Sequence, residues 1–189
     1  NFFYVWMKEF CPEVDFFSRE TIDSTKEAIV NKGHNKGAKE YTDLMAGVFS
    51  SCHKVLKDNG RLIFTFHHKK IEAWWTIAES LSRAGFCVVD TFAVESEYKV
   101  NPHIRDKETL DMDLVLVCEK KNPGNEDPTD IFSELIAKAS EEHNNPNWHY
   151  LQFIGLLLTE TTRCFDNHLV NFGWFEEMNE KHNSLNHRA

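Results

Sequence analysis

Two short polar clusters hold the residues of this chain whose types and spacing could do chemistry. His67, His68 and Lys69 directly follow the run 61–66, and a second cluster spans residues 101–105. The run 61–66 is short and rich in apolar, aromatic and β-branched residues, which is typical of a buried strand. Open α/β sheets bind ligands at the carboxyl ends of their strands, so we predict that His67 and Lys69 line a substrate pocket. A structural role, in which they cap the next helix or bond a neighbouring loop, is the competing interpretation.

The second cluster has side chains that suit nucleic acid. Asn101 and Arg105 can bond base edges or phosphates, although a plain surface loop fits the same residues. Metal binding is not favoured, because adjacent histidines on a strand end point in different directions and no third ligand follows at a suitable spacing. Glycine-rich nucleotide loops and the G-x-S-x-G elbow are missing from the sequence. We therefore expect no catalytic residue and no metal site in this chain.

Hydrophobic periodicity predicts an α/β arrangement around the 61–66 strand. Helices are predicted over 2–10, 39–58 and 71–84, and further strands over 86–94 and 112–118. We expect Asn59-Gly60 to end the second helix in a left-handed turn. The inward face of that helix is predicted to carry Tyr41, Leu44, Met45, Val48, Cys52, Val55 and Leu56. Trp74 and Trp75 open the third helix, and we expect a core role for them rather than a stacking platform for a base.

Composition divides the chain into three parts. Residues 1–121 form the predicted α/β part, residues 122–128 read as a linker, and residues 129–189 read as an acidic helical appendage. The last 68 residues carry eleven acidic and four basic side chains, a charge of −7 out of the total of −9. An acidic tail does not bind nucleic acid by itself, whereas the near-neutral α/β part can carry a local basic face.

The cysteines and the apolar runs place the chain in a broad class. Five scattered cysteines without a C-x-x-C pair indicate free thiols rather than a zinc ribbon or a disulfide framework, which favours the cytoplasm. The apolar runs are too short to span a bilayer, so we expect no membrane partner. The first residues already belong to an apolar element, and we expect a fragment whose N-terminal part is missing.

Four ordered segments carry a resemblance to a known family. They read NFFYVWMK at 1–8, STKEAIV at 24–30, VLKDNGRL with HHK and EAW within 55–74, and AGF, NPHIR and LVLVCEK within 84–120. The set resembles the C-terminal part of the large adenine-specific DNA methylases that carry a zinc-ribbon insertion, over about residues 1–121. Thr25 stands where that family usually has proline. The VLK-x-x-G-x-L segment alone is common to many methyltransferases, so the likeness depends on the ordered set.

The resemblance implies a fold and an activity. The fold would be the C-terminal half of a Rossmann-like methyltransferase sheet with an appended helical segment. The activity would be methyl transfer from S-adenosylmethionine to N6 of adenine in DNA, with the target base flipped out of the duplex. The family's glycine-rich cofactor loop and Asp-Pro-Pro-Tyr motif would lie upstream, so the partners would be DNA and the missing N-terminal part of the same protein. The implied substrate-binding residues are Tyr4, His67, Lys69, Asn101 and Arg105.

Two other functions are compatible with the residues. The chain can be a non-catalytic interaction module whose acidic helices dock on a partner protein. It can also belong to a methyltransferase that acts on RNA or on a small molecule.

Overall fold

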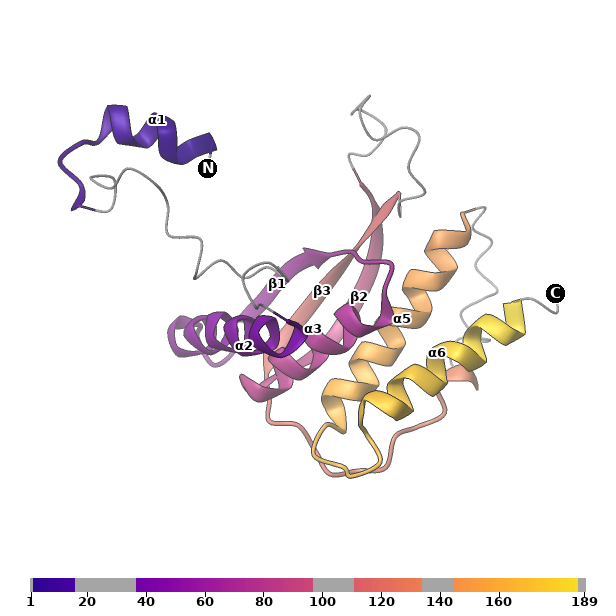
Figure 1. The fold of residues 1–189 in the computed structure, drawn as a ribbon. Helices are drawn as coiled ribbons and strands as arrows, with labels where there is room; N and C mark the ends of the chain where they lie inside the picture. The colour runs from indigo at the N-terminus through magenta and orange to yellow at the C-terminus, as the bar shows by residue number, and fades with distance from the viewer. Residues whose placement is uncertain (1, 16–36, 97–110, 134–144, 187–189) are drawn as a thin grey trace.

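A small sheet with helices packed against it forms the body of the protein. A computed structural model describes residues 2–15, 37–96, 111–133 and 145–186. Figure 1 shows three central strands, which are β1 (Arg61–Phe66), β2 (Phe86–Glu95) and β3 (Met112–Lys120). The helices are α1 (Phe2–Phe10), α2 (Ala38–Val55), α3 (Ile71–Arg83), α5 (Pro146–Arg163) and α6 (Phe172–Asn186). The predicted helices and strands named above are all present with bounds shifted by a few residues, which confirms a mixed α/β class.

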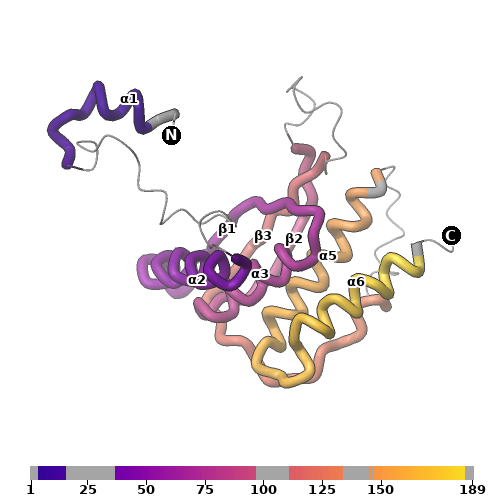
Figure 2. Tube along the Cα trace, viewed as in Figure 1, coloured from indigo at the N-terminus to yellow at the C-terminus, as the bar shows by residue number. Residues whose placement is uncertain are grey.

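The third strand lies between the first two. The strand order is β1-β3-β2, which the labels of Figure 2 follow, and both pairings are antiparallel. Strands β1 and β2 therefore run parallel to each other, and α3 connects them as the crossover helix of a βαβ unit. One β-bulge, between Val88 and Asp90, interrupts the pairing of β2 with β3. The carboxyl ends of β1 and β2 and the beginning of β3 lie together at one end of the sheet.

Among the described residues, the helices complete a common core on one face of the sheet. The core side chains of β1 and β3 are Leu62, Phe64, Phe66, Leu114, Leu116 and Cys118. On the opposite face Ile63 is 59% exposed, and Phe92 of β2 is 46% exposed. The prediction that 61–66 is a fully buried strand is therefore wrong. Its side chains alternate between exposed and half-buried, because β1 is an edge strand with one covered face among the described residues.

The packing face of α2 agrees with the predicted one only in part, since Met45 and Leu56 pack against the core as expected. Its buried residues are Thr42, Ala46 and Phe49, whereas Val48 is 50% and Val55 is 85% exposed. Small side chains at 42 and 46 let α3 approach closely, and the Ser80 hydroxyl donates to the Thr42 carbonyl at 3.1 Å. Close approach of two backbones decided the packing face here, so the expected inward position of Val48 and Val55 is wrong.

The two glycines at element ends have different functions. Gly85 follows α3 with φ +79°, a left-handed conformation that suits glycine. Gly60 does not adopt positive φ, and α2 instead ends as Leu56 becomes extended, with φ −69° and ψ 141°. The predicted left-handed stop at Asn59-Gly60 is therefore wrong for Gly60. A Cβ at Gly60 would lie 2.8 Å from Leu56 Cδ1, so this glycine is explained by a close contact.

Helices α5 and α6 share the core of the sheet. The backbone N–H of Val88 donates to Thr162 Oγ1 of α5 at 2.9 Å, which gives one backbone group on the outer edge of β2 a partner. Side chains of α5 and α6, among them Phe153 and Phe175, are fully buried in the same core cluster as the sheet. Trp75 of α3 packs among rings that follow α5, which are Phe165, Phe172 and Phe175 at centroid distances of 5.6–6.1 Å.

A substitution of Gly155 tests how closely α5 lies on β2. A Cβ at this position would overlap the Thr91 side chain, so something must shift. We expect Gly155→Ala to lower the free energy of unfolding by about 1–3 kcal/mol, measured by urea unfolding, although alanine has the higher helix propensity. Gly47→Ala in α2 is the matched control. Its added Cβ meets nothing within 4 Å, and we expect stabilisation of up to about 1 kcal/mol. Equal stabilisation by both substitutions would contradict the contact.

Candidate functional site

The polar turn after β1 begins with two histidines that have different environments. His68 Nδ1 accepts a hydrogen bond from the Lys70 backbone N–H at 2.9 Å, and the His68 ring stacks on Phe66 with an interplanar angle of 12°. The His68 carbonyl accepts from Trp74 Nε1 at 2.8 Å. These contacts fix the turn between β1 and α3, so the structural interpretation holds for His68.

His67 contacts a carboxylate on the neighbouring strand. His67 Nδ1 lies 2.6 Å from Asp113 Oδ1, while the His67 side chain remains 51% exposed. An ionised aspartate can only accept hydrogen bonds, so Nδ1 carries the proton and donates it. In the neutral imidazole the other nitrogen, Nε2, is then an acceptor, and it makes no hydrogen bond to a described residue. The pair thus presents an oriented lone pair at the carboxyl end of β1.

A second polar network holds the beginning of β3 in place. The Ser96 N–H donates to the Asp111 carbonyl at 3.0 Å, which closes the base of the connection between β2 and β3. The Asp111 carboxylate accepts from Asn145 Nδ2 at 3.0 Å and from Asn147 Nδ2 at 2.8 Å, so it joins β3 to the first turn of α5. Asp113, two residues along, is paired opposite Val94 of β2. The carboxylate that contacts His67 therefore stands on a strand that is fixed on both sides.

The five predicted substrate residues are not all brought together. His67 and Lys69 share the turn after β1, and both are exposed. Tyr4 is buried on α1, which Figure 1 shows set apart from the sheet, so it does not join them. Asn101 and Arg105 lie outside the described residues.

Sequence reasoning missed Asp113, although a signal for it exists. It is a single acid among apolar residues of β3, in the run Met-Asp-Leu-Val-Leu-Val-Cys. A lone carboxylate in such a strand needs a partner. Its pairing with His67 depends on the strand order, which the sequence does not reveal.

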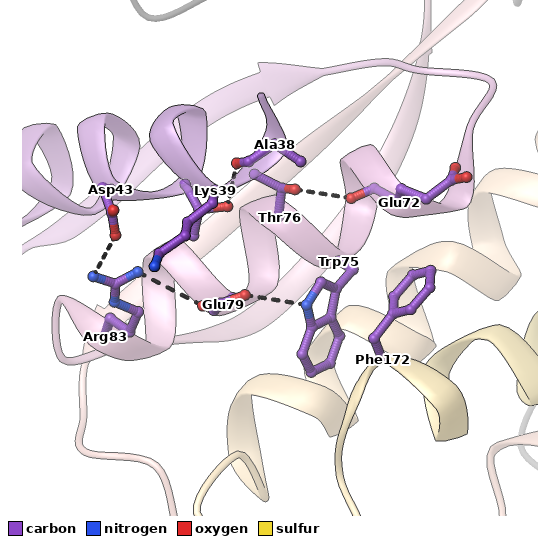
Figure 3. A pocket seen from close by; sticks show the side chains of 10 residues that line it. Ala38, Lys39, Asp43, Glu72, Trp75, Thr76, Glu79, Arg83 and Phe172 are labelled. Carbon is purple, nitrogen blue, oxygen red and sulfur yellow. Dashed lines mark hydrogen bonds and ion pairs between the residues drawn. The ribbon is translucent and has the colours of Figure 1, made fainter. Parts of the chain in front are cut away.

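A groove of about 450 Å³ lies elsewhere, on the outer surface of α2 and α3 (Figure 3). Its lining includes Trp75 and Phe172, but it contains none of the five predicted residues. Within it Arg83 contacts Asp43 at 2.8 Å and Glu79 at 3.6 Å, and Glu79 also accepts from Trp75 Nε1. Several of its polar side chains thus bond one another, and the groove holds none of the residues predicted to bind substrate. We place the candidate site at the carboxyl end of the sheet.

The cysteines do not add a reactive group to the described structure. All five are free, and Cys87, Cys118 and Cys164 are buried. Burial raises the pKa of Cys118 to about 12, with a smaller contribution from Cys87, so the Cys118 thiol stays protonated at neutral pH. Within residues 2–15, 37–96, 111–133 and 145–186 no group of three or more His, Cys, Asp or Glu side chains could hold a metal. Nor is any helix of these ranges long and apolar enough to cross a membrane.

Comparison with known proteins gives no match. No family model, no curated protein and no solved structure is significantly similar to the chain.

Proposed function

We propose that this chain is the C-terminal part of a cytoplasmic, S-adenosylmethionine-dependent DNA methyltransferase that modifies N6 of adenine. The proposal starts from the ordered segments that resemble the zinc-ribbon-containing adenine methylases. Support comes from a βαβ unit of two parallel strands whose carboxyl ends carry polar side chains, as ligand-binding α/β sheets do. The antiparallel β3 lies between the two parallel strands, so the described sheet is mixed, and mixed sheets occur among doubly wound folds.

The observation that carries the proposal is the incompleteness of the sheet on the side of β1. Among the described residues β1 pairs only with β3, and Ile63 on its uncovered face is 59% exposed. Doubly wound sheets cover both faces with helices and surround their ligand-binding strands with neighbours. Further strands and helices, which the resemblance assigns to the upstream part of the protein, would complete β1 in this way. An exposed apolar edge of this kind otherwise favours aggregation.

The resemblance assigns the cofactor site to the upstream part of the protein. The turn after β1 has the sequence His-His-Lys-Lys rather than a glycine-rich loop, and its side chains are exposed. A nucleotide-like cofactor needs close approach to the backbone, which glycine permits. This chain therefore supplies the substrate side of the proposed site, where DNA would bind, and the methyl donor would be held upstream.

The direct test uses the complete gene product that contains this chain. We expect it to form N6-methyladenine when incubated with duplex DNA and S-adenosylmethionine, detected by mass spectrometry after nuclease digestion. A methylated RNA product instead would favour the RNA alternative. The proposal would be contradicted by a folded protein that binds the cofactor but forms no methylated nucleic acid.

Ile63→Lys tests the structural argument. We expect this substitution to leave the unfolding of the 189-residue chain nearly unchanged, because the side chain is exposed there. In the complete protein the lysine would be buried without a partner, and methylation should be lost. Val55→Lys is the control, since Val55 is 85% exposed on α2, outside the proposed contact. Full activity of the Ile63→Lys protein would show that nothing packs on this face of β1.

A further inference from the structure

We propose that His67 Nε2 accepts a hydrogen bond from the exocyclic amino group of the target base, and that Asp113 is the positioning residue that makes this possible. The proposal rests on the proposed function, because the ligand it names is the amino group that would be methylated. It extends that function by assigning one atom of this chain to the substrate.

The first argument is the direction in which His67 can bond. The 2.6 Å contact between Nδ1 and the Asp113 carboxylate favours the tautomer that carries the proton on Nδ1, because an ionised carboxylate can only accept. In the neutral imidazole the remaining nitrogen is then an acceptor, and the Asp113 contact holds the ring that carries it. An acceptor of this kind matches an N–H donor such as an amino group and repels the oxygens of a phosphate. The geometry therefore favours a base over the DNA backbone as the group that His67 binds.

The second argument is the rigidity of the pair. Asp113 lies on β3, which is hydrogen-bonded to β1 on one side and to β2 on the other. The adjacent bonds of Asp111 to Asn145 and Asn147 hold the first residues of this strand to α5. A side chain that orients a substrate atom has to be held in this way by rigid elements. An ordinary surface ion pair between flexible side chains would not have this support.

The third argument is the division of functions between the two histidines. His68 uses its Nδ1 and its carbonyl to build the turn, through Lys70 and Trp74. His67 is not needed for that turn, and its side chain is exposed at the carboxyl end of β1. In the proposed methyltransferase this is the edge of the sheet at which a flipped base would lie.

Asp113→Asn tests the pair because it retains the shape and removes the charge. An amide can donate to Nδ1, so the imidazole can move its proton to Nε2 and lose the acceptor, as happens when the triad aspartate of a serine protease is replaced. In the 189-residue chain we expect ¹⁵N NMR of His67 to show the Nδ1–H tautomer, and the variant to shift toward Nε2–H. In the complete protein we expect kcat/KM for DNA methylation to fall about 3- to 10-fold, the range for loss of one hydrogen bond.

Two further variants make the test specific. Glu119→Gln is the matched control, because Glu119 pairs with Arg61 at 2.9 Å at the other end of the same two strands. We expect it to leave the His67 tautomer and the methylation rate unchanged. His67→Gln should retain more activity than His67→Ala, because the glutamine amide oxygen can replace Nε2 as an acceptor.

The outcomes separate this inference from the proposed function. If the unaltered complete protein methylates DNA and Asp113→Asn shifts the tautomer without slowing methylation, the inference is wrong and the proposed function stands. If His67 in the unaltered chain is found in the Nε2–H tautomer, the inference is also wrong. If the unaltered protein transfers no methyl group to nucleic acid, the inference and the proposed function are both wrong.

Discussion

Replacement of Trp74 by alanine is expected to lower the free energy of unfolding by about 3–5 kcal/mol, the largest effect of any substitution in α3. The side chain is fully buried and packs edge-on against Phe66 at a centroid distance of 5.0 Å. Its Nε1–H donates to the His68 carbonyl at 2.8 Å, so the ring joins α3 to the turn that carries His67. Alanine would leave a cavity and would also remove the donor to the partly buried His68 carbonyl. Urea unfolding of the 189-residue chain, followed by circular dichroism, measures the loss.

Two controls make this prediction informative even if the alanine variant does not fold. Trp74→Phe keeps an aromatic ring and removes the donor, and we expect a loss of about 1–3 kcal/mol. Trp6→Ala removes the same side chain from α1, where it is 54% exposed, and should cost much less. A Trp74→Phe protein as stable as the unaltered chain would contradict the assigned hydrogen bond. Equal losses at Trp6 and Trp74 would contradict the burial.

Local features of the sequence were sufficient to predict which elements are present and, within a few residues, their bounds. Strand β1 starts and stops at the predicted residues. The core role expected for the two tryptophans is confirmed, since Trp74 is fully buried and Trp75 packs among aromatic rings. These features depend on residues that are close in sequence, such as periodic apolar side chains and glycine at a helix end.

Features that depend on distant residues were not predictable. The insertion of β3 between β1 and β2 is set by pairing across about fifty residues, and it alone brings Asp113 to His67. The inward positions of Val48 and Val55 on α2 were wrongly predicted because the small residues Thr42 and Ala46 form the buried contact, and apolar periodicity does not measure close approach. The burial of β1 was wrongly predicted because an apolar run does not tell how many faces of a strand are covered.

The relation of the C-terminal helices to the sheet also depends on distant contacts. Composition separates residues 122–128 as a linker, yet this segment bonds to the end of α5 and to the loop that follows it. The Gly124 N–H donates to the Arg163 carbonyl at 2.6 Å, and Asn167 Nδ2 donates to the Glu126 carbonyl at 3.0 Å. The proline, glycine and asparagine residues correctly predict that this segment is neither helix nor strand. They do not predict that its backbone groups bond to α5 and to the loop after it.

Glu160 of α5 is the carboxylate on which this attachment depends. It is buried, and it accepts from Arg163 Nη2 at 2.7 Å and from Arg163 Nε at 3.0 Å. It also accepts from the backbone N–H of Thr129, and Arg163 continues to Glu126. We expect Glu160→Ala to lower the free energy of unfolding by about 1–3 kcal/mol in urea unfolding at pH 7, because it removes the hydrogen bonds that join Arg163 and the partly buried Thr129 N–H to this carboxylate. Glu119→Ala, which breaks an exposed pair with Arg61, should cost about 0–1 kcal/mol.

The contribution of Glu160 should also depend on pH in a defined direction. Burial raises the pKa of this carboxyl group, but the hydrogen bonds from Arg163 and Thr129 outweigh burial and hold the pKa below the ordinary 4.5. A carboxyl whose pKa is lowered by folding stabilises the native state fully above its unfolded pKa and loses that contribution as the pH falls through the folded value. The difference in stability between the unaltered chain and Glu160→Gln should therefore be constant near pH 7 and shrink below about pH 4.5. A difference that grows on acidification would mean that burial dominates at this carboxylate and that the bonds to Arg163 and Thr129 do not hold it ionised.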